Sequence, residues 1–395
     1  ACSTPARDKP SMLAPWDLPT PQPENLCASK PRFLPIWSNS YRSGEIMLLP
    51  SYKYQTYPYP TYVVYMKTQK PRIAIVAGGY SGEREVSLRS AATIIKNIDR
   101  TLFSPYLVRL SRDLWEVQVE DTWLPIDRNH FSFSMGDKEC RFDYAFITIH
   151  GTPGENGLLQ GYFDMLEIPY NTGGVLCESL TFDKFTCNHY LSAFGIRIAA
   201  SERLFSDIPY QVEEVAKRIP LPVFVKPNAG GSSIATTKVT SMDQLAVAIQ
   251  KAFEEAPEVL VERLIEGTEV TSGCYIVNNT HHPLPLTEVV IKKGEFFDFD
   301  AKYHGNSDEI TPARISEKLT QELQELTSRI ALLLHAQGII RVDYIIEADG
   351  KPTLLEVNTT PGMTEASFIP QEIRAAGLEL SHIFTAIIND KLHLL

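Results

Sequence analysis

The chain has 395 residues, of which 44% are hydrophobic and 22% charged, proportions that are ordinary for a folded globular protein. This length exceeds one typical domain and predicts two or three. The formal net charge of -11 argues against a general role in nucleic-acid binding, so an anionic ligand would need locally placed cations. No apolar run reaches the ~18 residues of a membrane span, and we expect no membrane association.

The six cysteines, at positions 2, 27, 140, 177, 187 and 274, lie far apart and form no CxxC motif. Their spacing predicts reduced thiols and a cytoplasmic protein rather than a disulfide framework or a zinc site.

Residues 1–65 differ in composition from the rest of the chain. They hold 11 of the 27 prolines and 7 of the 17 tyrosines, with no sustained hydrophobic period, no glycine-rich motif and no signal-peptide pattern. We interpret them as a disordered or artefactual extension, with an interaction arm as the alternative. Met66 looks like a natural start, because a lysine-flanked strand follows it directly.

An α/β unit follows. A buried strand at 73–77 runs into the glycine turn 78–82 and then into a helix, an order typical of nucleotide-binding units, although GGxxG spacing is weak evidence for a dinucleotide. Glu83 begins that helix, where an acid also simply complements the helix dipole. His150 follows the apolar strand 144–149, at an edge where open α/β sheets bind ligands, although a structural histidine is as plausible there.

The sequence between these strands is less regular. Residues 107–123 are expected to be strand material, and the stretch up to about Arg141 has no clear period and is interpreted as an irregular insertion. The turn-rich stretch 170–174 predicts a domain junction.

The middle of the chain has the features of a phosphate site without a P-loop, since no GxxxxGK[ST] occurs. A helix from about Thr181 carries Lys184, and a strand at 222–226 ends in Lys226. The glycines and serines that follow can offer backbone N–H and hydroxyl donors to phosphates: Gly230, Gly231, Ser232 and Ser233. A capping box at 241–244 opens the next helix, and a strand at 259–262 comes after it.

Residues 298–311 are polar, and we expect a loop that closes over a reactive intermediate, or else a plain surface loop. A helix with an apolar stripe is predicted over 316–336, stopped by Gly338, and a last helix near 379–389.

The stretch 340–363 predicts a β-hairpin around Asp349-Gly350, a strong hairpin signal. A turn of two or four residues at that centre places Asp343 opposite Glu356, and Arg341 opposite Asn358. Because side chains alternate along a strand, all four then lie on one face, with Cβ atoms of opposite residues ~5 Å apart. A loop with an odd number of residues would destroy this pairing.

Two carboxylates and an amide oxygen at this spacing suit Mg²⁺, and the arginine suits a phosphoryl group or a developing oxyanion. The alternative is a solvated sheet face with one ion pair. The apolar residues that flank these positions favour burial, and buried charges need partners.

Seven motifs in order resemble those of the D-alanine–D-alanine ligases, a family of the ATP-grasp superfamily: GGYSGEREVS, HGTPGENGLLQG, VFVKPNAGGSS, LVERLIEGTEVT, DFDAKY, GIIRVDY and LLEVNTTPGMT. The resemblance begins at about Lys70 and implies an α/β (α+β) ATP-grasp fold. It implies a parallel-sheet lobe at 66–172 and an ATP-grasp domain at 173–393, whose lobes 173–262 and 263–393 clamp ATP. The segment 111–141 matches the family poorly. The tripeptide that ends at Lys184 is FDK, where the family often has MDK.

The resemblance also implies roles for individual residues. Those that match the ATP site are Lys184, Lys226, Ser232, Ser233, Glu262, Leu264 and Glu269. Those that match the Mg²⁺ ligands are Asp343, Glu356 and Asn358, for two ions that Mn²⁺ can replace. Those that match the substrate and catalytic groups are Glu83, His150, Lys302, Tyr303, Arg341, Gly362 (through its backbone N–H) and Ser367.

The activity implied is the ATP-dependent joining of two D-alanines through an acyl phosphate, in the cytoplasm, for peptidoglycan synthesis, by a homodimer. One alternative is a D-alanine–D-lactate ligase, but by the resemblance Tyr303 favours the dipeptide product. The other is an ATP-binding regulator without activity, but the presence of Arg341 together with the three matched metal ligands argues against it.

Residues 1–65 have no core-forming pattern, so a chain that starts at Met66 is expected to fold and to keep its activity. Soluble yield and turnover of that shortened chain measure this, and loss of soluble protein would contradict it.

Overall fold

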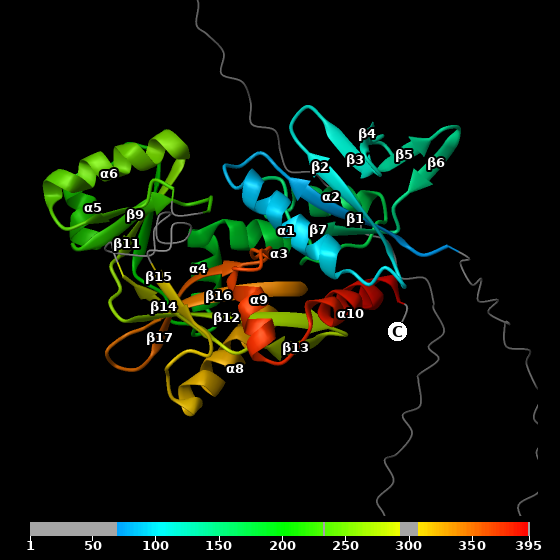
Figure 1. Ribbon diagram of the computed structural model, residues 1–395. Coiled ribbons are helices and arrows are strands. Elements are labelled where there is room, and N and C mark those ends of the chain that lie inside the picture. The colour runs from blue at the N-terminus through cyan, green and yellow to red at the C-terminus, as the bar shows by residue number, and fades with distance from the viewer. Residues whose placement is uncertain (1–68, 232–233, 293–306, 394–395) are drawn as a thin grey trace, which may run out of the picture. The chain divides into compact units, whose positions relative to one another are not determined.

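The computed structural model describes residues 69–231, 234–292 and 307–393, all within one unit, Met66–Leu395 (Figure 1). The expectation for residues 1–65 therefore lies outside the described residues. Among the described helices, none is both long and apolar enough to cross a bilayer.

The first sheet has the strand order β4-β3-β2-β1-β7. Strand β1 (Arg72–Gly78) pairs in parallel with β2 (Ser104–Leu110) and β7 (Tyr144–Ile147), in agreement with the parallel-sheet lobe that the resemblance implies. Alternate residues of β1 pack into two different hydrophobic clusters, one on each face of the sheet, which explains its continuous apolar run. Helix α1 (Arg84–Asn97) packs against β1, and α2 (Leu158–Met165) follows β7.

The strand material expected over 107–123 is confirmed, because β3 (Trp115–Val119) and β4 (Thr122–Pro125) extend the sheet antiparallel from β2. The stretch after it, interpreted as an irregular insertion up to about Arg141, is regular, which corrects that expectation. It forms the hairpin β5 (Ser132–Met135) with β6 (Lys138–Arg141), whose strands of four residues are too short to show a period.

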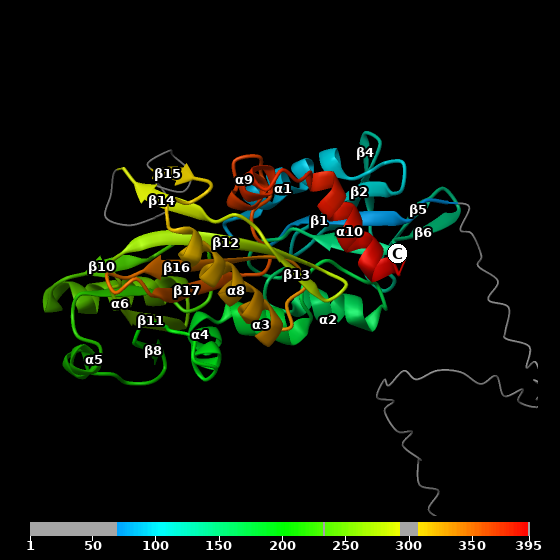
Figure 2. The ribbon, with the colours of Figure 1, turned by 90° about the horizontal axis from the view of Figure 1, so that it is seen from below.

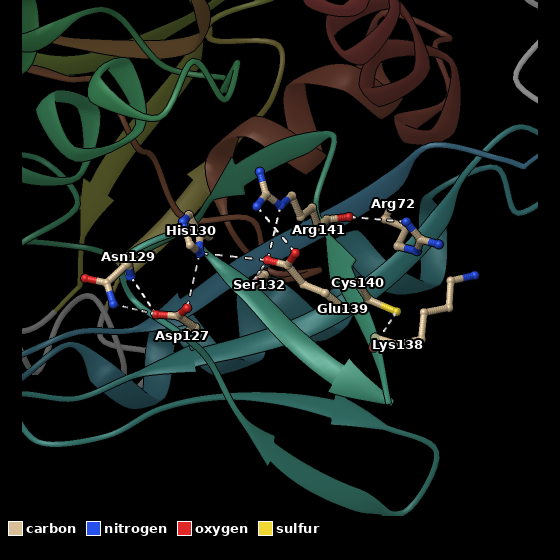
Figure 3. A network of polar contacts seen from close by, with 9 residues as sticks. All are labelled: Arg72, Asp127, Asn129, His130, Ser132, Lys138, Glu139, Cys140 and Arg141. Atoms are coloured by element: carbon tan, nitrogen blue, oxygen red, sulfur yellow. Dashed lines mark hydrogen bonds and ion pairs between the residues drawn. The ribbon is translucent and has the colours of Figure 1, made fainter. Parts of the chain in front are cut away.

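A polar network joins β5 and β6 (Figure 3). The Glu139 carboxylate accepts hydrogen bonds from Ser132 Oγ at 2.9 Å and Arg141 Nε at 3.2 Å. At the base of the hairpin, His130 Nδ1 lies 3.3 Å from the Asp127 carboxylate. These contacts are local and mostly exposed, so they fix the hairpin rather than form a buried site.

The second sheet is antiparallel, in the order β10-β9-β11-β8. Its strands are β8 (Ser201–Phe205), β9 (Val223–Pro227), β10 (Thr237–Val239) and β11 (Glu258–Arg263). Helices α5 (Val212–Arg218) and α6 (Met242–Glu255) share its hydrophobic cluster. α6 begins where the capping box predicts, but the Ser241 side chain makes no cap bond, and Gln244 Oε1 accepts instead from the backbone N–H of Thr240.

The helix expected from about Thr181, with Lys184 inside it, begins at Lys184 as α4 (Lys184–Ser192), and a separate helix α3 (Val175–Phe182) precedes it. Asp183 between them has an extended backbone, and its side chain accepts from Thr186 N, so it caps α4. Lys184 is therefore the first residue of a helix rather than an internal one.

The third sheet has the order β15-β14-β12-β16-β17, with β13 paired to β12. Its strands are β12 (Thr268–Val277), β13 (Thr280–Pro283), β14 (Thr287–Ile291), β15 (Ser307–Ile310), β16 (Gly338–Ile346) and β17 (Pro352–Asn358). Helix α8 (Glu317–Leu333) shares a hydrophobic cluster with one face. Helices α9 (Phe368–Ala375) and α10 (Leu380–Leu392) share a cluster with α1, on the side of the sheet away from α4 (Figure 2).

The hairpin β16–β17 has the predicted pairs but reaches them differently. The backbone N–H of Glu347 bonds to Lys351 O, which leaves an odd loop over 348–350. A β-bulge follows, because Asp343 pairs with Glu356 while Tyr344 pairs with Leu354, so Leu355 is the extra residue. The bulge reverses the one-residue shift in register that the odd loop introduces. The prediction that an odd loop would destroy the pairing of Asp343 with Glu356 is therefore wrong.

Gly350 closes this loop with φ of +74°, and a Cβ added there would meet nothing within 4 Å. A substitution thus changes only the backbone energy. We expect Gly350→Val to lower the free energy of unfolding by about 1 kcal/mol and Gly350→Asn by much less, because asparagine tolerates the left-handed region. Denaturant midpoints of the two variants measure this, and equal midpoints would contradict it.

Candidate active site

The predicted metal and oxyanion residues share one face of the hairpin. Arg341 pairs with Asn358, and Asp343 pairs with Glu356, across β16 and β17. The intervening Val342 and Val357 belong to the hydrophobic cluster on the opposite face. Alternation along both strands therefore separates the polar face from the core, as predicted.

Asp343 is the most heavily bonded member of this group. Its carboxylate accepts from Arg341 Nε and Nη2, both at 2.8 Å, from Thr271 Oγ1 at 2.6 Å and from Asn358 Nδ2 at 3.1 Å. Burial lowers the pKa of Arg341 while the Asp343 carboxylate raises it, and the net shift is upward. Arg341 is thus a fixed cation with a bidentate partner.

The predicted phosphate lysines each pair with a carboxylate. Lys184 Nζ lies 3.5 Å from Glu356 Oε2 and donates to Gly230 O at 2.6 Å. This lysine, at the start of α4, thus connects the glycine-rich segment with the hairpin.

Lys226 Nζ donates to Glu262 Oε2 at 2.8 Å, between neighbouring strands β9 and β11. Burial lowers the pKa of Lys226 and Glu262 raises it, with a net upward shift that keeps the lysine cationic. Leu264 follows β11 and bonds through its backbone N–H to Pro222 O, while Glu269 lies two residues from Thr271 on the same face of β12.

Glu83 and His150 lie near this glycine-rich segment. A Cβ added at Gly231 would collide with the Glu83 carboxylate, so the two are in contact. Ser81 joins both regions, because its Oγ donates to His150 O at 2.8 Å and accepts from Glu83 N at 3.3 Å.

His150 is buried, and its Nδ1 lies 2.9 Å from Thr360 O in the segment after β17. Burial lowers the pKa of His150 and favours the neutral imidazole. Nε2 is buried and has no hydrogen-bond partner among the residues described. One ring nitrogen therefore holds the histidine in place, and the other is available to a ligand.

Gly362 and Ser367 lie next to each other. A Cβ on Gly362 would be 2.9 Å from Ser367 Oγ. Ser367 precedes α9, and its Oγ lies 2.7 Å from Thr364 Oγ1 and accepts from Thr364 N at 3.1 Å. Four predicted site residues, Ser232, Ser233, Lys302 and Tyr303, and most of the loop 298–311 lie outside the described residues.

The donor set of the hairpin fits a hard cation. In the parts of the chain that the structure describes, no three His, Cys, Asp or Glu side chains form a metal-binding group. Asp343 and Glu356 are two carboxylates, and the third predicted ligand, Asn358, contributes an amide instead. Oxygen ligands of these kinds suit Mg²⁺, which retains several waters and shares substrate phosphates.

Sequence reasoning missed Thr271 and Glu155. Strand alternation from Glu269 along β12 could have indicated Thr271, once the pairing of β12 with β16 was known. Glu155 stands in the quoted motif with His150, and its carboxylate accepts from Gly151 N at 2.5 Å. Burial and, less strongly, the Glu83 carboxylate raise the pKa of Glu155 to about 8.

A raised carboxyl pKa makes stability fall with pH. Glu155 keeps its proton in the folded chain up to about pH 8 but loses it near pH 4.5 in the unfolded chain. Its contribution to the free energy of unfolding therefore declines between these pH values. Glu155→Gln in the ligand-free protein should therefore gain stability relative to the natural chain as pH rises from 5 to 8. The gain stays below the limit of about 1.4 kcal/mol per pH unit for one proton. Denaturant unfolding at several pH values measures this, and a constant difference would contradict it.

Two family profiles match the chain. The profile described as D-ala D-ala ligase N-terminus matches residues 72–173, and that described as D-ala D-ala ligase C-terminus matches residues 194–389. A D-alanine–D-alanine ligase of Porphyromonas gingivalis is 59% identical over 327 residues, which cover 82% of this chain and 99% of the relative. One of Parabacteroides distasonis is 55% identical over 324 residues, 82% of this chain and 98% of the relative.

Solved structures agree in fold. The D-alanyl-alanine synthetase A of Vibrio cholerae aligns with a TM-score of 0.74 at 27% identity, over 82% of this chain and 99% of its own. The VanG D-Ala:D-Ser ligase of Enterococcus faecalis aligns with a TM-score of 0.72 at 29% identity, over 81% of this chain and 99% of its own. A Bacillus anthracis D-alanine–D-alanine ligase complexed with ATP aligns with a TM-score of 0.65 at 26% identity, over 82% and 98%. The predicted ATP-grasp fold and the resemblance read from the seven motifs are both confirmed, and the chain belongs to the D-alanine–D-alanine ligase family.

Proposed function

We propose that this chain uses ATP to join two D-alanines into D-alanyl-D-alanine, through an acyl phosphate, for peptidoglycan precursors. The observation that carries the proposal is the polar face of the hairpin. There Asp343 faces Glu356, Arg341 faces Asn358, and Lys184 reaches Glu356. This face combines the groups for a metal–phosphate cluster with a fixed cation for a developing oxyanion.

Asp343, Glu356 and Asn358 would hold Mg²⁺, as two ions that Mn²⁺ can replace, and the bound cations would neutralise phosphate charge. Lys184 and Lys226 then bind phosphate oxygens. Each lysine already has a carboxylate neighbour, at 3.5 Å and 2.8 Å, which compensates its charge before ATP arrives. Glu262, Leu264 and Glu269 hold the adenine and ribose.

The carboxylate of the first D-alanine attacks the γ-phosphorus of ATP, which gives an acyl phosphate and ADP. Glu83 would hold the ammonium of this D-alanine. His150, whose Nε2 has no hydrogen-bond partner among the described residues, would contact the substrate as a neutral imidazole without adding charge.

The amine of the second D-alanine then attacks the acyl carbon. Arg341 and the Gly362 N–H stabilise the tetrahedral oxyanion, which collapses with loss of phosphate and of the amine proton. Ser367, adjacent to Gly362, holds the carboxylate of the second D-alanine. Loss of a preorganised oxyanion donor typically raises the barrier by about 3 kcal/mol.

Phosphate release tests the proposal. Purified protein with ATP, Mg²⁺ and D-alanine should release phosphate and form the dipeptide. An ester product formed preferentially with added D-lactate would favour the D-alanine–D-lactate alternative. ATP binding without phosphate release would favour a regulator.

The oligomeric state and the cellular location are part of the same proposal. We infer a homodimer in the cytoplasm, and sedimentation of the purified protein at several concentrations measures its oligomeric state. A monomer at all concentrations would contradict the dimer without affecting the proposed chemistry.

Glu356→Gln tests the metal site directly. The substitution keeps shape but removes one negative charge next to Lys184, so we expect a normal fold. We expect turnover to fall on the order of 100-fold at saturating ATP, as when other preorganised charge-stabilising groups are lost. The measurement is turnover against Mg²⁺ concentration, with a melting curve for folding.

Glu347→Gln is the matched control. Glu347 directly follows β16 in the same hairpin, but its carboxylate pairs with Arg197 and Arg263 and not with the predicted ligands. This variant should lose some stability and keep its turnover. Near-normal turnover of Glu356→Gln at ordinary Mg²⁺ would show that the hairpin is not the metal site.

A further inference from the structure

Glu372 is a buried acid for which the proposed reaction has no use. It lies in α9 with 0% of its surface exposed. Its Oε2 accepts from Gly273 N at 2.9 Å, and its Oε1 accepts from Thr287 Oγ1 at 3.2 Å. One side chain thus joins α9 to both β12 and β14, at the centre of the third sheet.

The strand beneath Glu372 is shaped to receive it. Gly273 pairs with Arg341 across β12 and β16, so this contact lies directly beside the site arginine. A Cβ added at Gly273 would collide with the Glu372 carboxyl and lie 2.6 Å from Ile369 Cδ1. Glycine at this position therefore lets α9 approach the strand closely.

The same face of α9 reaches Arg341 itself. Phe368 stands four residues before Glu372, one helical turn away. Its ring centre lies 5.4 Å from Arg341 Cζ. Ser367, directly before Phe368, is the residue that the proposed function places on the carboxylate of the second D-alanine. The depth at which α9 packs on β12 thus sets Ser367 and the Phe368 ring relative to Arg341.

The carboxyl performs this role without adding a charge. Burial raises the pKa of Glu372 well above its ordinary value, and the hydrogen bonds from Thr287 and Gly273, and less strongly the charge of Arg341, only partly offset this. A neutral acid offers one donor and several acceptor positions, and it does not compete with Asp343 for the arginine.

We propose that Glu372 is a positioning residue that seats the Ser367 end of α9 against β12 and β14, and thereby shapes the subsite of the second D-alanine beside Arg341. The inference rests on the proposed function for Ser367. Glu372 itself touches no substrate and acts through the helix.

Three variants of the full chain test it, each with measured KM values for the second D-alanine and for ATP. Glu372→Met keeps the length and removes both hydrogen bonds. Because the shift of α9 reaches the subsite only indirectly, the variant should raise the KM for the second D-alanine by about tenfold, less than the two hydrogen bonds contribute to stability. The KM for ATP should not change. Glu372→Gln, which can still accept from Gly273 N, should restore the natural value.

Thr327→Val is the control for stability alone. Thr327 is buried in α8, and its Oγ1 lies 3.0 Å from Tyr344 OH in the cluster on the opposite face of the sheet. It should lower the melting temperature and leave both KM values unchanged. If Glu372→Met behaves like Thr327→Val, the inference is overturned.

Two further results decide the remaining cases. If Glu372→Met does not fold, Gly273→Ala replaces it, because the added Cβ pushes α9 outward. An unchanged KM for the second D-alanine in that variant would overturn the inference.

Ser367→Ala separates the inference from the proposed function. An unchanged KM in Ser367→Ala refutes the role of Ser367, whereas a raised KM there with a natural KM in Glu372→Met refutes only the role of Glu372.

Discussion

The register of β16 against β17 is the constraint on which the site depends. The odd loop at 348–350 would, in a regular ladder, turn Glu356 and Asn358 towards the hydrophobic cluster. The extra residue Leu355 reverses that shift, and Asn188 Nδ2 in α4 donates to its carbonyl at 3.0 Å. The bulge therefore serves two purposes, since it keeps Glu356 and Asn358 on the polar face and ties the hairpin to the helix that begins with Lys184.

Charge pairing follows from this placement. A buried cation or carboxylate is costly unless it is paired and hydrogen-bonded. Arg341 is paired with Asp343, Lys226 with Glu262 and Lys184 with Glu356. In the ligand-free chain these carboxylates compensate the cations that would otherwise repel one another.

Much of the site could be predicted because alternation and turn chemistry are local. The alternation along each strand of the hairpin, the glycine turn before Glu83 and the strand that carries Lys226 all follow from short patterns. The bulge could not be predicted, since Asn188 of α4, which bonds to its extra residue, is distant in sequence. The break at Asp183 was missed because one residue of extended backbone does not interrupt the apolar pattern. The β5–β6 hairpin was missed because its strands are too short to show alternation.

Buried acids on both sides of the segment after β17 show why such residues are hard to recognise from sequence. Glu178 in α3 accepts from Thr359 Oγ1 at 2.6 Å, as Glu372 in α9 accepts from Gly273 N. Burial raises the pKa of both carboxyls well above the ordinary value. A methylene chain at position 372 would leave the Gly273 N–H and the Thr287 hydroxyl without this acceptor. A carboxyl whose pKa is raised by burial keeps both hydrogen bonds, so a residue type usually associated with charge here provides hydrogen bonds to two strands.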